Sequence, residues 1–407
     1  MEKTLLVKST RGIVLCSLMV FSARAQVNFS KDDLENATDM KTLSQSLSSK
    51  VLNDDVWPDT ISVQEKSFNI SYAFNSELTS FVKKLLRRYY SAYTSVVVLD
   101  NNTGKVLTAI DYTHKTKSFG RKLTLSSSHP AASVFKVITA ANLLEKKVTT
   151  NEKLYSYNGK STTLYKYQLR DKKNRWTRTI PFHRAFAWSN NVIFAKAAQK
   201  GTSVDELSQT AKKFGFGSEL MQVLDLQESR IFQAEDKYSL AELASGFNRQ
   251  TLISPLHGAI ISSVVANNGV LRTPHIVSSI YDQQIKQKIW APKLNYKRVL
   301  STATSTSLEN LMNMTVSNGT ASAAFRREQS RAPFKNLVIG GKTGSITGGE
   351  PFGKRDWFVS YAKPKESEVD TGISVCVMII NLKKWYVKAP FIAKEIIRYY
   401  YDAQDKV

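Results

Sequence analysis

The chain has 407 residues and a mass of 45.7 kDa, with 42% hydrophobic and 22% charged residues. This length and composition suit one large or two modest globular domains and exclude a disordered or fibrous protein. The formal net charge of +23 predicts a strongly positive surface, which leaves nucleic acid, anionic lipid and cell-envelope polymers open as partners.

Residues 1–25 have the pattern of a secretory signal peptide. Basic residues precede an apolar run at 12–21, and Ala23 and Ala25 form a small-residue cleavage site. A membrane anchor is the alternative, but this run is only about half of the roughly 20 residues that a transmembrane helix needs. We therefore expect an exported protein of the periplasm or cell envelope, cleaved after Ala25.

Residues 26–67 predict an acidic, polar leader that is loosely ordered. Seven acidic and three basic side chains lie within residues 26–64, which are also rich in Ser and Asn. One globular domain is expected to cover the remaining residues, 68–407.

The predicted domain opens with a helix over 76–93, whose apolar residues fall at helical spacing. Strands follow at 94–99 and 106–110, joined by a turn at 101–104. Residues 131–144 (AASVFKVITAANLL) are apolar nearly all round, which predicts a helix in the middle of the domain.

The rest of the chain predicts helices with strands near the C-terminus. Helices are expected at 185–198, 204–214, 256–265 and 391–400, and strands at 337–339, 357–362 and 373–380. Strands at both ends with helices between them predict an α+β fold, with an antiparallel sheet drawn from opposite ends of the chain. Cleavage of the signal peptide leaves a single cysteine, Cys376, so we expect a buried packing residue and no intrachain disulfide.

The central helix carries a candidate nucleophile and base. Ser133 and Lys136 lie three residues apart, which places them on one helical face. A lysine in apolar surroundings loses its charge and can take a proton from a serine, while the helix N-terminus stabilises the alkoxide. The S-x-x-K pattern alone is weak, because residues 80–83 and 360–363 share it and a helical lysine commonly reaches solvent.

A second motif, S-x-N, is formed by Ser189 and Asn191. It supplies a hydroxyl that can relay a proton and an amide that can hold a substrate amide. This motif is also weak alone, since residues 67–69 and 156–158 match it.

A third motif, K-T-G, occurs once, directly after an apolar stretch. Lys342 supplies positive charge and Thr343 a hydroxyl for a substrate carboxylate, while Gly344 allows close approach. The backbone N–H of Ser345, the next residue, is expected to join that of Ser133 as an oxyanion hole.

In this order and spacing, the three motifs make the chain resemble the penicillin-binding proteins and serine β-lactamases. Further segments resemble a transpeptidase domain, namely 92–110, 214–217, 253–256, 266–269, 318–321 and 357–360. The resemblance covers roughly residues 68–400. It implies a central antiparallel sheet flanked by helices on both faces, plus an all-helical lobe, with the site between this lobe and the sheet edge at Lys342.

The resemblance implies serine acyl transfer on the D-alanyl-D-alanine end of peptidoglycan stem peptides. Ser133 attacks the carbonyl, Lys136 takes its proton, Ser189 passes a proton toward the leaving amine, and Asn191 holds the substrate. A second stem peptide or water then resolves the acyl-enzyme, which makes the protein a D,D-transpeptidase or a D,D-carboxypeptidase. β-Lactams would acylate the same serine. No metal or organic cofactor is implied, and the sequence has no H-E-x-x-H or paired-cysteine ligand set.

The chain departs from the family pattern at three places. Ser345 stands where many members have Thr, which keeps the backbone donor. Ala131 and Ala132 follow Pro130 where Pro-Gly is often found. The segment before residue 68 is too short for a glycosyltransferase domain or the usual large pedestal module, which leaves placement to partner proteins of cell-wall synthesis.

Two alternatives keep the same fold. A β-lactamase would pass the acyl group quickly to water; Asn191 differs from the S-x-V of class D enzymes, and the class A glutamate cannot be located from one sequence. A non-catalytic cell-wall scaffold would retain only the pocket, and the intact Ser133, Lys136, Ser189 and Lys342 argue against it.

A third alternative is nucleic-acid binding. Residues 165–184 mix seven basic with four aromatic side chains, as single-strand binders do. Export argues against this partner, and a solvated basic loop is the simpler interpretation. The positive surface is instead expected to hold the protein near anionic glycan or phospholipid head groups. The five histidines have no G-x-S-x-G context and are interpreted as structural or surface residues.

Overall fold

The computed structural model describes residues 31–367 and 371–404, so the predicted signal peptide lies outside the described residues. The chain divides into two compact units, residues 1–41 and 42–407. Helix α1 (Lys31–Leu52) begins in the first unit and ends in the second. In the described part of the chain, no helix is long and apolar enough to cross a bilayer.

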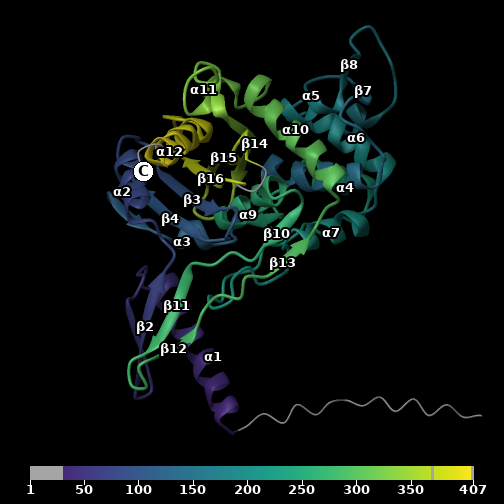
Figure 1. Cartoon of the computed structure of the whole chain (residues 1–407). Coiled ribbons are helices and arrows are strands. Elements are labelled where there is room, and N and C mark those ends of the chain that lie inside the picture. The colour runs from purple at the N-terminus through teal and green to yellow at the C-terminus, as the bar shows by residue number, and fades with distance from the viewer. Residues whose placement is uncertain (1–30, 368–370, 405–407) are drawn as a thin grey trace, which may run out of the picture. The chain divides into compact units, whose positions relative to one another are not determined.

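A six-stranded antiparallel sheet lies at the centre of the second unit (Figure 1). Its strands in spatial order are β14 (Leu337–Gly348), β15 (Gly353–Pro364), β16 (Ile373–Asn381), β3 (Tyr93–Asp100), β4 (Val106–Thr113) and β5 (Ser118–Gly120). The C-terminal β16 pairs with the N-terminal β3, from Ile373 opposite Asp100 to Ile380 opposite Tyr93. The predicted α+β fold, with a sheet drawn from both ends of the chain, is confirmed.

Helices cover one face of this sheet at the side of the C-terminus (Figure 1). They are α2 (Ser76–Leu86), α11 (Ser322–Phe325) and α12 (Ala389–Gln404). Their apolar residues form one core cluster with alternate residues of β3, Val96 and Val98, because successive side chains of a strand point to opposite faces.

The opposite face packs against α9 (Pro255–Ala266) and the short α3 (Lys122–Leu125). Gly258 of α9 approaches the sheet so closely that an added Cβ would lie 2.8 Å from the Cys376 Sγ. Cys376 is fully buried, and its burial raises the pKa of the thiol. The prediction that Cys376 is a buried packing residue is confirmed.

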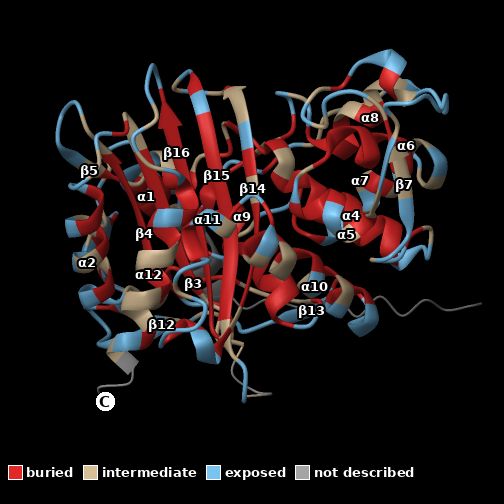
Figure 2. Cartoon of the chain, turned by 90° about the horizontal axis from the view of Figure 1, so that it is seen from above, coloured by how far each residue is buried: buried red, intermediate tan, exposed pale blue. Residues whose placement is uncertain are grey.

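A helical lobe lies beside the edge strand β14 (Figure 2). It consists of the 3-10 turn η1 (Ala132–Phe135) and the helices α4 (Lys136–Glu145), α5 (Phe182–Ala187), α6 (Asn191–Gly201), α7 (Val204–Lys213), α8 (Lys237–Ser245) and α10 (Thr302–Asn318). Every residue of α4 from Lys136 to Leu144 is buried, which confirms the predicted central helix.

The single helix predicted over 185–198 is instead two helices, α5 and α6. Ser189 between them adopts a left-handed φ of 56°, which a continuous helix does not allow. Asn190 then starts α6 by accepting a hydrogen bond from the Ile193 N–H. This break sets the position of the S-x-N motif.

Shorter strands complete the fold. A four-stranded sheet contains β1 (Thr60–Val63), β2 (Lys66–Tyr72), β11 (Val277–Asp282) and β12 (Gln287–Trp290). Three strand pairs are β6 (His129–Pro130) with β9 (Leu252–Ile253), β7 (Leu154–Tyr157) with β8 (Arg178–Pro181), and β10 (Val270–Arg272) with β13 (Tyr296–Arg298). Two further 3-10 turns are η2 (Lys166–Leu169) and η3 (Phe334–Asn336).

The segment predicted as a loosely ordered leader has regular structure in its described part, so that expectation is wrong there. Leu43, Leu47 and Val51 of α1 are fully buried, and they recur every four residues on one helical face. Strands β1 and β2 form a hairpin whose second strand pairs with β11. Polar residues are more numerous than apolar residues in this segment, so its composition alone does not reveal the helical spacing of the three buried residues.

The buried face of α1 predicts a measurable contribution to stability. Leu47→Ala leaves a cavity and should lower the free energy of unfolding by about 2–5 kcal/mol. Lys50→Ala on the same helix is the matched control, because the Lys50–Asp54 ion pair is exposed and should change stability by less than about 1 kcal/mol. Urea unfolding measures both variants, and equal effects would show that this face of α1 is not part of the core.

Candidate active site

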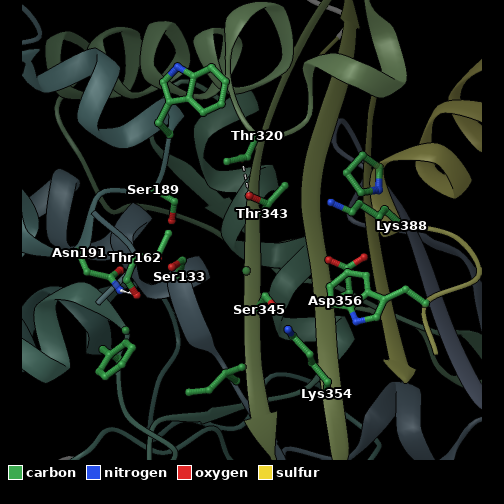
Figure 3. A pocket seen from close by; sticks show the side chains of 17 residues that line it. Ser133, Thr162, Ser189, Asn191, Thr320, Thr343, Ser345, Lys354, Asp356 and Lys388 are labelled. Carbon is green, nitrogen blue, oxygen red and sulfur yellow. Dashed lines mark hydrogen bonds between the residues drawn. The ribbon is translucent and has the colours of Figure 1, made fainter. Parts of the chain in front are cut away.

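The structure brings the residues of all three motifs to one place (Figure 3). Ser133 lies on η1, Lys136 begins α4, Ser189 lies in the α5–α6 turn, Asn191 begins α6, and Lys342, Thr343, Gly344 and Ser345 lie on β14. A pocket of about 440 Å3 has Ser133, Ser189, Asn191, Thr343, Gly344 and Ser345 in its wall. The site therefore lies between the helical lobe and the sheet edge, as the sequence predicted.

Lys136 lies behind the pocket wall and is fully buried. Its Nζ donates hydrogen bonds to the Asn191 Oδ1 at 2.7 Å and the Ser245 carbonyl at 2.5 Å, and it lies within hydrogen-bond distance of the Ser133 Oγ, at 2.9 Å. Burial, with a smaller contribution from the charge of Lys342, holds the pKa of Lys136 well below its ordinary value. Burial therefore favours the uncharged amine of Lys136 over its ammonium form.

These contacts orient the lone pair of the uncharged amine. The Asn191 Oδ1 and the Ser245 carbonyl can only accept, so they take the two remaining amine hydrogens. The lone pair then faces the third neighbour, the Ser133 hydroxyl, which can donate to it. Lys136 is thus placed to remove a proton from Ser133.

Asn191 is fixed on its other side as well. Its Nδ2 donates to the Thr162 carbonyl at 3.0 Å, and this bond assigns the orientation of the amide. The carbonyl end of Asn191 consequently serves Lys136 in the free protein, a positioning contact that the sequence motif did not indicate.

Lys342 is the second buried amine of the site. Its Nζ donates to the Ser189 Oγ at 3.0 Å and to the Thr343 carbonyl at 2.9 Å. Burial lowers the pKa of Lys342 to about 7, so near neutral pH it exchanges between charged and uncharged forms. The Thr343 hydroxyl shares a hydrogen bond of 2.5 Å with the Thr320 hydroxyl, as Figure 3 shows.

Two glycines allow the turn η1, which carries Ser133, to pack closely against its neighbours. An added Cβ on Gly344 would lie 3.3 Å from the Ala132 Cβ, which brings β14 against η1. Gly246, which ends α8, has a φ of +65°, and its added Cβ would lie 1.9 Å from the Ala132 carbonyl oxygen. Ala132 itself has a left-handed φ of 50°, so both neighbours constrain a strained turn directly before Ser133.

Sequence reasoning missed several residues of the site. Ser245 acts through its backbone carbonyl, which no side-chain motif can reveal. Gly246 carries the signal of a helix-ending glycine and could have been found on that basis. Thr320 lies in the segment 318–321, which resembles the family pattern but gave no indication of a role in the site.

The far part of the pocket was not predicted either (Figure 3). Asp356 lies opposite Ser345 on β15 and accepts a hydrogen bond from the Ala389 N–H at 2.9 Å. Burial raises the pKa of Asp356 to about 6. Lys354 and Lys388 lie 5.0 Å and 5.6 Å from the centroid of the Trp385 ring, so this end of the pocket carries charges of both signs.

Two buried histidines have structural partners. His129 contacts the Leu123 carbonyl at 2.9 Å, and burial lowers its pKa to about 3. His257 contacts the Phe214 carbonyl at 2.9 Å, and burial lowers its pKa to about 4. Both rings are therefore neutral at physiological pH and neither lines the pocket.

A family model described as "Penicillin binding protein transpeptidase domain" matches residues 94–397. The chain therefore belongs to the family of penicillin-binding protein transpeptidase domains. The resemblance inferred from the three motifs is confirmed.

Particular relatives are similar to parts of the chain. Peptidoglycan D,D-transpeptidase PbpA of Mycobacterium tuberculosis is 24% identical over 260 residues, which cover 62% of this chain and 50% of the relative. The protein of the same name from Mycolicibacterium smegmatis is 23% identical over 265 residues, with the same coverage. The chain thus spans about half the length of the curated relatives it matches.

Solved structures share the fold. The D,D-transpeptidase domain of a peptidoglycan glycosyltransferase from Eggerthella lenta superposes with a TM-score of 0.67 at 21% identity, covering 88% of this chain and 87% of its own. Penicillin-binding protein 3 from Mycobacterium tuberculosis gives a TM-score of 0.68 at 18% identity, covering 87% and 84%. These matches confirm the predicted β-lactamase/transpeptidase-like fold.

The close contact between Gly246 and Ala132 predicts that one methyl group added at Gly246 lowers the stability of the protein strongly. Gly246→Ala adds a Cβ that collides with backbone and requires a left-handed alanine, so stability should fall by more than about 2 kcal/mol. Gly217→Ala is the matched control, because its φ is +62° but nothing lies within 4 Å of the added Cβ, and strain alone costs about 1–2 kcal/mol. Chemical unfolding measures the free energy of unfolding of both variants and so separates the cost of the collision from the cost of backbone strain. If Gly246→Ala lost no more stability than Gly217→Ala, the close contact with Ala132 would be contradicted.

Proposed function

We propose that this chain is an exported serine D,D-transpeptidase that acts on peptidoglycan stem peptides through an acyl-enzyme at Ser133. The observation that carries the proposal is the position of the buried Lys136 Nζ, 2.9 Å from the Ser133 Oγ, with its other two hydrogens held by acceptors. A lysine exposed to water would stay protonated at neutral pH and could not serve as the base.

In the proposed first step, the Ser133 Oγ attacks the carbonyl carbon between the two terminal D-alanines while Lys136 takes the serine proton. The backbone N–H groups of Ser133 and Ser345 stabilise the developing oxyanion. The carbon–nitrogen bond then breaks, and a proton passed through Ser189 leaves with the D-alanine amine. The contact of Ser189 with Lys342 supports this relay, because it keeps the hydroxyl in the pocket.

The substrate carboxylate is proposed to lie at the K-T-G strand. Thr343 presents its hydroxyl to the pocket, and Lys342 adds positive charge from behind the strand. Asn191 binds the substrate amide through the hydrogen of its Nδ2 that the Thr162 carbonyl does not take.

The acyl-enzyme is resolved by the amine of a second stem peptide, which forms a cross-link, or by water, which gives carboxypeptidase activity. The names of the curated relatives, which are peptidoglycan D,D-transpeptidases, support the first outcome. The structural neighbours include an imipenem acyl-enzyme of penicillin-binding protein A and an ampicillin complex of penicillin-binding protein 3, both from Mycobacterium tuberculosis. They support acylation of Ser133 by β-lactams, and the signal-peptide pattern supports export.

The proposal predicts one covalent adduct after incubation with a β-lactam. Intact mass spectrometry should show a gain of one drug mass in the wild type and none in Ser133→Ala. Ser80→Ala is the matched control, because Ser80 also begins an S-x-x-K sequence but lies exposed on α2, and it should keep the adduct. An adduct that persists in Ser133→Ala would refute the nucleophile, and rapid loss of the adduct with drug turnover would identify a β-lactamase.

The two buried lysines predict a bell-shaped pH dependence of acylation. Lys136 must be uncharged to act as a base, so the second-order rate constant falls as pH drops through its lowered pKa. Lys342 must be charged to attract a carboxylate, so the rate constant also falls above about pH 7, by up to about tenfold per pH unit. Stopped-flow acylation by a carboxylate-bearing β-lactam measures this profile.

Lys342→Arg provides the control for the alkaline limb. The guanidinium stays charged, so its profile should lose the decline above pH 7 even if its overall rate is lower. An alkaline limb that is unchanged in Lys342→Arg would assign that limb to another group.

A further inference from the structure

The basic segment 165–184 contributes to a second pocket that the proposed reaction does not use. This pocket of about 480 Å3 lies between the β7–β8 region and the middle of α6, elements that are neighbours in Figure 1, and it shares no residue with the active-site pocket. Its charged residues are Lys153, Asp171, Lys172, Lys173, Lys196 and Lys200. Five ammonium groups and one carboxylate give it a formal charge of +4.

The carboxylate of Asp171 lies between two of these lysines. Its oxygens are 2.7 Å from the Lys196 Nζ and 2.5 Å from the Lys200 Nζ. Hydrogen bonds from both lysines lower the pKa of Asp171 to about 2, so it is ionised throughout the physiological range. The chain therefore places one of its own anions in the position that an external anion would take.

Lys196 is the buried member of the cluster. Only 8% of the residue is exposed, and its Nζ also donates to the Ser156 carbonyl at 3.2 Å. Lys172 and Lys173 are exposed at the rim, and no acidic side chain in residues 31–367 and 371–404 forms an ion pair with either of them. The pocket thus has one buried lysine, Lys196, that is held by hydrogen bonds, and two exposed lysines, Lys172 and Lys173, that form no ion pair within the described residues.

The charge balance indicates which anion fits. A single carboxylate is already present and leaves the pocket at +4, so another monoanion would neutralise little of the remaining charge. A phosphate group carries about −1.5 to −2, and a lysine ammonium binds phosphate as a point charge without needing a planar partner. A ligand with two adjacent phosphates therefore matches the charge of the pocket.

The aromatic residues of the segment do not favour a nucleic-acid ligand. Tyr165 and Tyr167 stack on each other with ring centroids 5.8 Å apart, and Arg175 lies 4.8 Å from the centroid of Trp176. None of these rings lines the pocket. Tyr155 does line the pocket, but its ring contacts Phe182, with centroids 5.8 Å apart, and has the Lys153 Nζ 5.8 Å from its centroid. The pocket lining therefore lacks the succession of stacking rings on which single-strand binding depends.

We propose that the pocket between β7–β8 and α6 binds a diphosphate-type ligand, and that Asp171 competes with this ligand for Lys196 and Lys200. The proposal goes beyond acyl transfer and does not depend on it. The same chemistry is available from a soluble diphosphate or from a phosphate-bearing lipid head group.

Titration calorimetry of the full chain with inorganic pyrophosphate tests the proposal. Asp171→Asn keeps the shape of the side chain but removes the competing charge, so binding should tighten by about threefold to tenfold. Lys172→Glu with Lys173→Glu reverses two rim charges and should weaken binding by at least about tenfold. General attraction by a basic protein would change in the same two directions, so a control that alters charge outside the pocket is needed to show a built site.

A matched charge control is Lys288→Glu with Lys297→Glu, which makes the same net change on exposed strand positions outside the pocket. It should bind pyrophosphate about as tightly as the wild type. Equal weakening in both double variants, or no tightening in Asp171→Asn, would overturn the proposal. Each variant should unfold in urea at the same midpoint as the wild type, which shows that it is folded and keeps this test independent of the proposed reaction.

Two further ligands identify the source of the phosphate. Vesicles of phosphatidylcholine with and without phosphatidic acid are compared by co-sedimentation at fixed ionic strength. Binding only to the phosphatidic acid vesicles, weakened by Lys172→Glu with Lys173→Glu, assigns a lipid head group, whereas pyrophosphate binding without vesicle binding assigns a soluble diphosphate. An oligonucleotide that bound more tightly than both and was unaffected by Asp171→Asn would overturn the assignment.

Discussion

The site depends on keeping one amine, Lys136, out of water. Burying an ammonium group is unfavourable, so apolar surroundings favour the uncharged amine, and acceptors satisfy the hydrogens that this amine keeps. Its hydrogen-bond partners come from η1, from the start of α6 and from the end of α8. The helical lobe must therefore bring three separate elements to one atom, and the nearly continuous apolar sequence of α4 is the part of the chain that makes this burial possible.

The residues that the structure brings together at the pocket could be named from the sequence because the three motifs are side chains with fixed spacing. Apolar patterning was enough to predict a buried helix around Ser133 and Lys136 and a strand leading to Lys342, whereas the position of Lys342 at the sheet edge was implied by the family resemblance. The structure places Ser133 on the 3-10 turn that precedes this helix. The Ser245 carbonyl could not be placed in this way, because a backbone acceptor carries no residue identity. Asn191 was found but its free-state contact with Lys136 was not, since that contact joins residues 55 positions apart in the chain.

The fold was predictable where apolar periodicity is strong and less so where conformation depends on one residue. Five strands of the central sheet and the covering helices α2, α9 and α12 lie where alternating and helical patterns predict them, whereas β5, α3 and α11 were not predicted. The break at Ser189 does not, because a left-handed serine leaves no mark in a hydrophobic pattern. The helix α1 was missed for a different reason: a few well-spaced apolar residues in a polar segment are enough for docking but change its composition little.

Strand β14 is the last strand of the central sheet, and its outer edge borders the pocket. A free sheet edge is a template for any extended chain, which makes it an aggregation hazard as well as a peptide-binding surface. Here η1, packed against Gly344, and α10 restrict access along that edge. The lobe that holds Lys136 therefore also covers part of the edge strand, which shortens the stretch of β14 that is available for pairing with another strand.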